Sequence, residues 1–155
     1  MAENKLYKIA LDKAMGQCSR REFCIDDIRI KLTLWGVERF DTEKILKTLI
    51  KEDFLNEPRY AAAFVRDKFK YNKWGKVKIA AHLGTKKLAS DVIRTALDSI
   101  DNEQYTKALR GIIEGHRRTV KAKNQYDLKA KLLRYGLSKG FESSLLYDIL
   151  NDVGD

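Results

Sequence analysis

The chain has 155 residues, and 31 Lys and Arg against 22 Asp and Glu give it a net charge of +9. Its uncharged apolar stretches are only a few residues long, whereas a membrane span needs ~20. The sequence begins without a signal-peptide pattern, so we expect a cytoplasmic protein that makes no membrane contact. Nine Gly and one Pro are too few for a β-sandwich, which needs turn residues every ~8–12 positions.

Apolar residues recur at helical spacing almost throughout the chain, which predicts an all-α fold of nine helices without a sheet. In chain order the apolar stripes cover residues 6–14, 25–35, 45–50, 60–69, 77–83, 92–97, 105–113, 128–135 and 145–150. The stretch 114–124 has little apolar content, so it is either a polar helix extension or a connection.

The expected helices fall into three groups of three. Leu32, Leu83 and Leu132 each follow an apolar residue by four positions, and they are 51 and 49 residues apart. A period of about 50 residues indicates one three-helix unit present in three copies. Such a unit has only a small core of its own. We therefore expect an elongated, curved array of repeats in which each unit packs against its neighbours and is stabilised by them. The predicted units are residues 1–55, 56–100 and 101–155.

Several residues are candidates for helix ends. Asn56 can cap a helix start, and Ser19-x-x-Glu22 fits a capping box, with a loop as the alternative. Gly36 and Gly136 stand where a helix is expected to stop, and a stop of this kind suits a positive φ.

Cysteine and histidine are scarce. Cys18 and Cys24 are six residues apart, and His82 and His116 lie far from them in sequence. This spacing matches no familiar zinc site, and two Cys do not make a disulfide scaffold. We therefore interpret both Cys as reduced structural thiols and expect no metal and no cofactor.

The positive charge is concentrated in the middle of the chain. Residues 1–55 have a net charge of +1, residues 56–100 of +6 and residues 101–155 of +2. A local excess of this size attracts a polyanion.

The first basic run carries eight cations against Asp67, with Trp74 and other aromatic residues interleaved. The cations are Arg66, Lys68, Lys70, Lys73, Lys76, Lys78, Lys86 and Lys87. Charge combined with aromatic rings is typical of single-stranded nucleic acid binding, although a solvated helix face is the alternative. Trp74, on the expected turn, is either a stacking platform or an anchor between repeats.

A second basic run covers residues 110–134 and has a net charge of +6. Its candidate contacts are Arg117, Arg118, Lys121, Lys123, Lys131 and Arg134. Here too a solvated helix face is the alternative. If both runs lie on one side, they form a continuous positive track that can displace counterions from a phosphate backbone.

No motif supports catalysis. The chain has neither a G-x-x-x-x-G-K-[ST] loop nor a G-x-S-x-G elbow. The adjacent pair Asp26-Asp27 would point apart on a helix, which does not favour acid/base chemistry. We therefore expect a binding protein rather than an enzyme.

Four segments of the chain carry further motifs: residues 18–23 (C-S-R-R-E-F), 51–65 (K-E-D-F-L-N-E-P-R-Y-A-A-A-F-V), 74–83 (W-G-K-V-K-I-A-A-H-L) and 132–141 (L-L-R-Y-G-L-S-K-G-F). Together these segments resemble the RecX family, regulators of the RecA recombinase. They follow the family order, and the junction at 51–65 is the most specific. The sequence departs from the family at Cys24, which replaces a Ser cap, at His82, which replaces a Glu, and at Lys87, which replaces a turn Gly.

The resemblance implies three tandem three-helix repeats and a role in recombination, DNA repair and the SOS response. It further implies binding in the groove of the RecA–DNA filament and suppression of ATP hydrolysis and strand exchange. We expect the protein to be a monomer. Its binding to single- or double-stranded DNA alone would be weak and non-specific. A stand-alone DNA- or RNA-binding helical module is the alternative, and an adaptor for acidic proteins is a third possibility.

Overall fold

The computed structural model describes residues 2–152, and this part of the chain folds into nine α-helices without a strand. The helices are α1 (Ala2–Arg20), α2 (Ile25–Leu34), α3 (Arg39–Lys51), α4 (Glu57–Lys70), α5 (Lys76–Thr85), α6 (Ser90–Asp98), α7 (Asn102–Arg117), α8 (Gln125–Ser138) and α9 (Ser143–Asn151). The predicted all-α fold is confirmed. Residues 114–124 are divided between the last turn of α7 and a connection.

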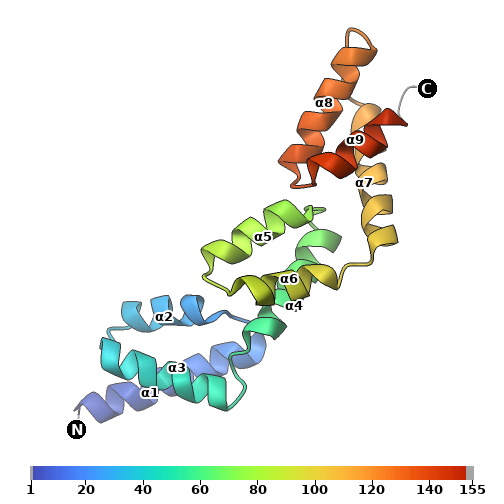
Figure 1. The fold of residues 1–155 in the computed structure, drawn as a ribbon. Helices are drawn as coiled ribbons and strands as arrows, with labels where there is room; N and C mark the ends of the chain where they lie inside the picture. The colour runs from blue at the N-terminus through green and yellow to red at the C-terminus, as the bar shows by residue number, and fades with distance from the viewer. Residues whose placement is uncertain (1, 153–155) are drawn as a thin grey trace.

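The helices follow one another along an elongated molecule, with α1 and α9 in the groups at its opposite ends (Figure 1). Helices α1–α3 lie at one end, α4–α6 in the middle and α7–α9 at the other end, while α2, α5 and α8 share one side. The periodic Leu32, Leu83 and Leu132 lie on these three helices, and none has any exposed surface. The residue boundaries of the three units stay a prediction.

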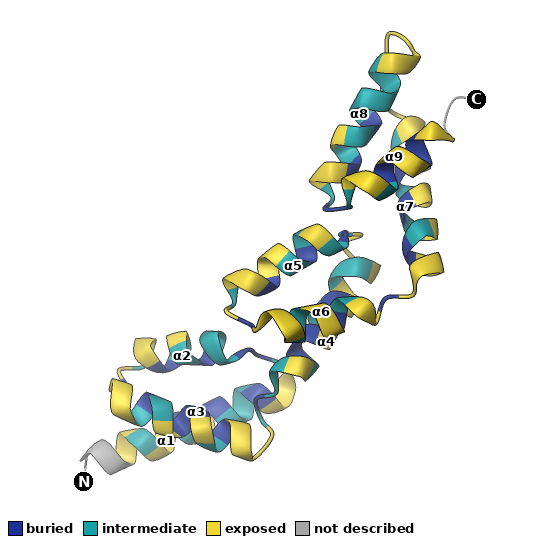
Figure 2. Cartoon of the chain, in the orientation of Figure 1, coloured by how far each residue is buried: buried dark blue, intermediate teal, exposed yellow. Residues whose placement is uncertain are grey.

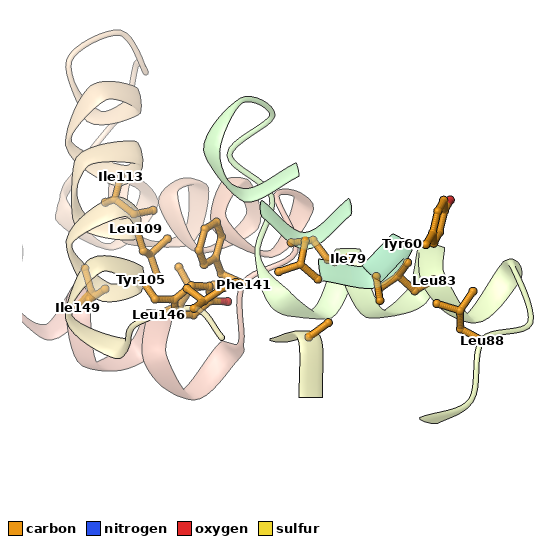
Figure 3. Close-up of a cluster of buried hydrophobic side chains, with 14 of the residues drawn as sticks. Tyr60, Ile79, Leu83, Leu88, Tyr105, Leu109, Ile113, Phe141, Leu146 and Ile149 are labelled. Carbon is orange, nitrogen blue, oxygen red and sulfur yellow. The ribbon is translucent and has the colours of Figure 1, made fainter. Parts of the chain in front are cut away.

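The buried side chains form two hydrophobic clusters. One cluster belongs to α1–α3 and the segments around them, where Ala14, Ile28 and Leu46 are buried. The other passes without a break from α4–α6 to α7–α9. Along the helices, buried residues alternate with exposed ones (Figure 2). Figure 3 shows the second cluster passing from Leu83 to Phe141. The middle and C-terminal helices therefore share one core.

The start of α2 is capped by a thiol. Ser19 lies in the last turn of α1, so the capping box predicted from Ser19 and Glu22 is wrong. Instead the Cys24 Sγ accepts from the Asp27 backbone N at 3.4 Å, and the Asp27 carboxylate accepts from the Cys24 N at 3.4 Å. Burial raises the pKa of the Cys24 thiol to about 11, so the cap stays a neutral thiol at physiological pH.

Two of the predicted helix ends are confirmed. The Asn56 side chain accepts from the Arg59 N at 2.9 Å at the start of α4. Gly36 follows α2 with φ +84°. Gly136 was expected to adopt a positive φ, and this is wrong because α8 continues through it to Ser138. Gly136 is instead a packing position, since a Cβ there would overlap the side chain of Leu146 on α9.

Gly140 is the residue with positive φ after α8, at +92°. The Gly75 N donates to the Lys139 O at 2.7 Å, and the Val77 N donates to the Gly140 O at 2.9 Å. A Cβ on Gly75 would overlap the Gly140 backbone, and a Cβ on Gly140 would overlap Lys78. We call this contact between residues 75–78 and 139–140 the glycine joint. It connects the start of α5 to the end of α8.

Replacing Gly140 with Ala should destabilise the protein by about 3 kcal/mol, because an L-residue is strained at this φ and the new Cβ has no space. The urea midpoint of unfolding measures the effect. Gly84→Ala is the control, since Gly84 is an exposed helical residue at which a Cβ meets nothing, and it should be neutral or stabilising by up to about 1 kcal/mol. Equal midpoints for the Gly140→Ala variant and the wild type would contradict this account of the joint.

Candidate polyanion-binding surface

The first basic run lies on α4, the following turn and α5, with Trp74 at its centre. The Trp74 ring is half-buried between Phe64 of α4 and His82 of α5, at centroid distances of 6.5 and 4.6 Å. The Lys68 and Lys78 Nζ atoms lie 5.0 and 4.7 Å from its ring centroid. Trp74 therefore packs within the middle group of helices and holds two cations by cation–π contact.

Three further lysines of the run surround the glycine joint. The Lys70 Nζ lies 5.3 Å from the Tyr71 ring centroid, and the Lys76 Nζ lies 4.9 Å from that of Tyr105. Lys73 is exposed in the turn and has φ +57°. Together with Lys68 and Lys78 these make five lysines, none of which forms an ion pair within the described residues.

The buried Tyr105 is hydrogen-bonded to the start of α5, beside the glycine joint. The Tyr105 hydroxyl accepts from the Lys76 backbone N at 2.9 Å and donates to a carboxylate oxygen of Glu142. Burial raises the pKa of Tyr105, and the hydrogen bond to Glu142 raises it further. The neutral hydroxyl therefore stays in place as donor and acceptor, and it links α5, α7 and the start of α9 beside the glycine joint.

Three other cations of the first run have acidic partners. The Lys86 Nζ lies 2.7 Å from Asp27 Oδ1, and the Lys87 Nζ lies 3.5 Å from Asp26 Oδ1. Both pairs connect α2 to the end of α5, and the Asp side chains are 15% and 13% exposed. Arg66 contacts its neighbour Asp67 at 3.4 Å. The carboxylates of Asp27 and Asp26 offset part of the charge of Lys86 and Lys87, whose side chains are 40% and 76% exposed.

The second basic run is dispersed. The Lys131 Nζ contacts Asp127 at 3.1 Å and donates to the Lys121 O at 2.6 Å, while Arg117 pairs with Glu114 at 3.6 Å. The other candidate contacts of this run are exposed, namely Arg118, Lys121, Lys123 and Arg134. The connection between α7 and α8 that carries Lys121 and Lys123 lies at the far end of α8 from the glycine joint (Figure 1). A 14-residue helix separates the two places, which corresponds to ~20 Å.

A cleft of about 760 Å³ lies between the two runs. It is lined by residues at the end of α4, in the following turn, on α7 and at the end of α8, and its cations are Lys70, Lys73, Lys107 and Lys139. Lys107 and Lys139 were not among the residues predicted from sequence, because neither belongs to a dense basic run. The only local indication was a helical face of α7 on which Lys107 is followed by Gly111 and Gly115.

The part of the chain that the structure describes contains no group of three His, Cys, Asp or Glu side chains that could hold a metal ion. None of its helices is long and apolar enough to cross a membrane.

Comparison with known proteins gives one consistent family. A family model described as RecX, second three-helix domain, matches residues 56–97. The Regulatory protein RecX of Clostridium acetobutylicum is 28% identical over 156 residues, covering 97% of this chain and 72% of the relative. The Regulatory protein RecX of Clostridium botulinum (strain Eklund 17B / Type B) is 33% identical over 128 residues, covering 81% of this chain and 58% of the relative.

Two solved structures share the fold. A crystal structure of regulatory protein RecX superimposes with a TM-score of 0.88 at 23% identity, covering 97% of this chain and 74% of that chain. The crystal structure of RecX from Lactobacillus salivarius gives a TM-score of 0.85 at 18% identity, covering 97% of both chains.

The Asp27–Lys86 ion pair should make stability depend on pH in the acid range. Burial raises the pKa of Asp27, but the hydrogen bonds from Lys86 and Cys24 outweigh it, so the pKa lies below its usual value. A lowered pKa contributes stability above about pH 4, and the contribution is lost as the pH falls through the folded-state value.

Asp27→Asn should therefore lower the free energy of unfolding by about 1–2 kcal/mol at pH 7, a modest value because Lys86 is partly exposed. The difference from the wild type should shrink below about pH 4. Urea unfolding at a series of pH values measures it, and a difference that is constant with pH would contradict the assignment to this carboxylate.

Proposed function

Because the chain belongs to the RecX family, we propose that it modulates a RecA-type recombinase by binding in the groove of the recombinase–DNA filament. Bound there, it suppresses ATP hydrolysis and strand exchange. The curated relatives carry the name regulatory protein, which favours a regulator rather than an enzyme. The chain spans 72% of the C. acetobutylicum relative and 58% of the C. botulinum one.

The observation that carries the proposal is the placement of five unpaired lysines on an elongated molecule. Lys68, Lys70, Lys73, Lys76 and Lys78 all lie between the end of α4 and the start of α5, near the middle of the long axis (Figure 1). Three helical groups in series can follow a groove, while a central positive surface contacts the phosphates that the groove exposes.

The shared core of α4–α9 also supports binding in a groove. Because the glycine joint and the Tyr105 hydroxyl hold the middle and C-terminal helices together, this part of the molecule meets a partner with little reordering. Pre-ordered surfaces lose less entropy on association than flexible ones.

A stand-alone DNA- or RNA-binding module is the second candidate. The net charge of +6 in residues 56–100 favours it, because electrostatic attraction alone gives non-specific binding to phosphate backbones. An adaptor for acidic proteins would use the same lysines without contacting DNA.

Reversing the charge of Lys70, Lys73 and Lys78 to Glu should weaken the effect on the filament without unfolding the protein. Wild-type protein should suppress DNA-stimulated ATP hydrolysis by RecA when present at a small ratio to the recombinase. The triple variant should need at least about tenfold more protein for the same suppression, because three phosphate contacts are lost. Helical circular dichroism and the urea midpoint check the fold.

Lys8, Lys47 and Lys51 form the matched control, since all three are exposed on α1 and α3 and their replacement by Glu changes the net charge equally. Equal loss of suppression in both triple variants would contradict a specific role for the central lysines. Tight DNA binding with no effect of the wild type on hydrolysis would favour the stand-alone module. Neither activity would favour the adaptor.

A further inference from the structure

The cleft between α4, α7 and α8 has a charge that is unusually one-sided. Lys70, Lys73, Lys107 and Lys139 come from four different segments and converge on it. No carboxylate lines it among the described residues, and none of the four lysines forms an ion pair there. Like charges gathered without counter-charge repel one another, so the arrangement favours an anionic occupant.

The cleft exists because one face of α7 carries small residues. Ala108, Gly111 and Gly115 all line it, and a Cβ added at either glycine would meet nothing within 4 Å. Each glycine inside a helix costs about 1 kcal/mol relative to Ala. The bare face of α7 leaves a shallow floor on which a flat group can lie.

Aromatic rings complete the walls. Phe69 lines the side formed by α4. The rings of His116 and Tyr135 also line the cleft, and they stack with their centroids 3.7 Å apart and an interplanar angle of 4°, which joins α7 to α8. Rings beside lysines are the combination with which proteins hold the bases and phosphates of a single strand. An acidic peptide would use the lysines but would gain little from the rings and the bare floor.

The glycine joint brings Lys139 close to the turn that carries Lys73. Lys139 precedes Gly140, whose backbone contacts residues 77 and 78, and its Nζ donates to the Asn72 O at 3.1 Å. Lys73 lies two residues before Gly75, on the other side of the joint. The cleft is thus held open by backbone contacts before any ligand arrives, which reduces the entropic cost of binding.

We infer that this cleft binds single-stranded nucleic acid, with phosphates against Lys107 and Lys139 and a base over the glycine floor of α7. The inference rests on the proposed function in that a filament presents a DNA strand to the cleft, but the binding itself needs no recombinase.

The first test removes charge from two residues that the basic runs do not include. The Lys107→Gln/Lys139→Gln variant is compared with Lys47→Gln/Lys51→Gln, which removes the same charge from exposed positions on α3. Binding of a fluorescein-labelled oligothymidylate to the protein alone is followed by anisotropy over a range of salt concentrations. The cleft variant should bind about tenfold more weakly, and its salt slope should fall by about 1.4, as expected for two lost single-strand phosphate contacts. The control should match the wild type.

The second test fills the cleft without changing its charge. Gly111→Leu places a side chain on the floor and improves the helix propensity of α7, so the fold is retained or stabilised. Gly84→Leu is the control on the exposed side of α5. Binding of the oligothymidylate should weaken at least about fivefold in the Gly111 variant alone, as expected for the loss of one stacked base.

The outcomes separate this inference from the proposed function. Wild-type affinity in both cleft variants, or a wild type that suppresses ATP hydrolysis without binding oligothymidylate, would overturn the inference and leave filament regulation standing. Cleft-dependent binding of polyglutamate but not of oligothymidylate would also overturn it. A wild type without effect on hydrolysis would overturn the proposed function, whereas cleft-dependent oligothymidylate binding would still support the inference.

Discussion

Two backbone hydrogen bonds at the glycine joint determine how the C-terminal helices sit against the middle ones. The bonds run from Gly75 to Lys139 and from Val77 to Gly140, at 2.7 and 2.9 Å. They can form only because the backbones approach closely enough to exclude a Cβ on either glycine. The continuous core of α4–α9 and the hydrogen bond from the Lys76 N to the Tyr105 hydroxyl accompany that close approach.

The cations of the middle helices divide into two groups with different roles. Lys86 and Lys87 face Asp27 and Asp26 of α2, and these pairs fix the N-terminal helices to the middle ones across a boundary where the hydrophobic clusters are separate. The lysines nearer the glycine joint have no such partners. Net charge per segment therefore overstates the positive charge that is available to a ligand, and the partners of each lysine decide where a polyanion can bind.

The helices were predictable from sequence because helical periodicity is a local property, and the leucines at 32, 83 and 132 mark the buried face of α2, α5 and α8. Helix ends were less predictable. Gly136 and Gly140 are both plausible stops, and the choice between them depends on Leu146 and Lys78, which approach only in the folded chain. The thiol cap by Cys24 could be expected only from the family pattern of a Ser at that place.

The cleft could be predicted only in part, because Lys70 and Lys73 belong to the first basic run but no local pattern connects Lys107 and Lys139 to it. Lys107 and Lys139 are 32 residues apart, and neither stands in a dense basic run. On a helix consecutive charges point to different sides, so a dense run does not by itself indicate which of its cations share one ligand. In the cleft, lysines from different elements surround an empty surface. Here Gly111 and Gly115 provide that surface, because neither carries a side chain.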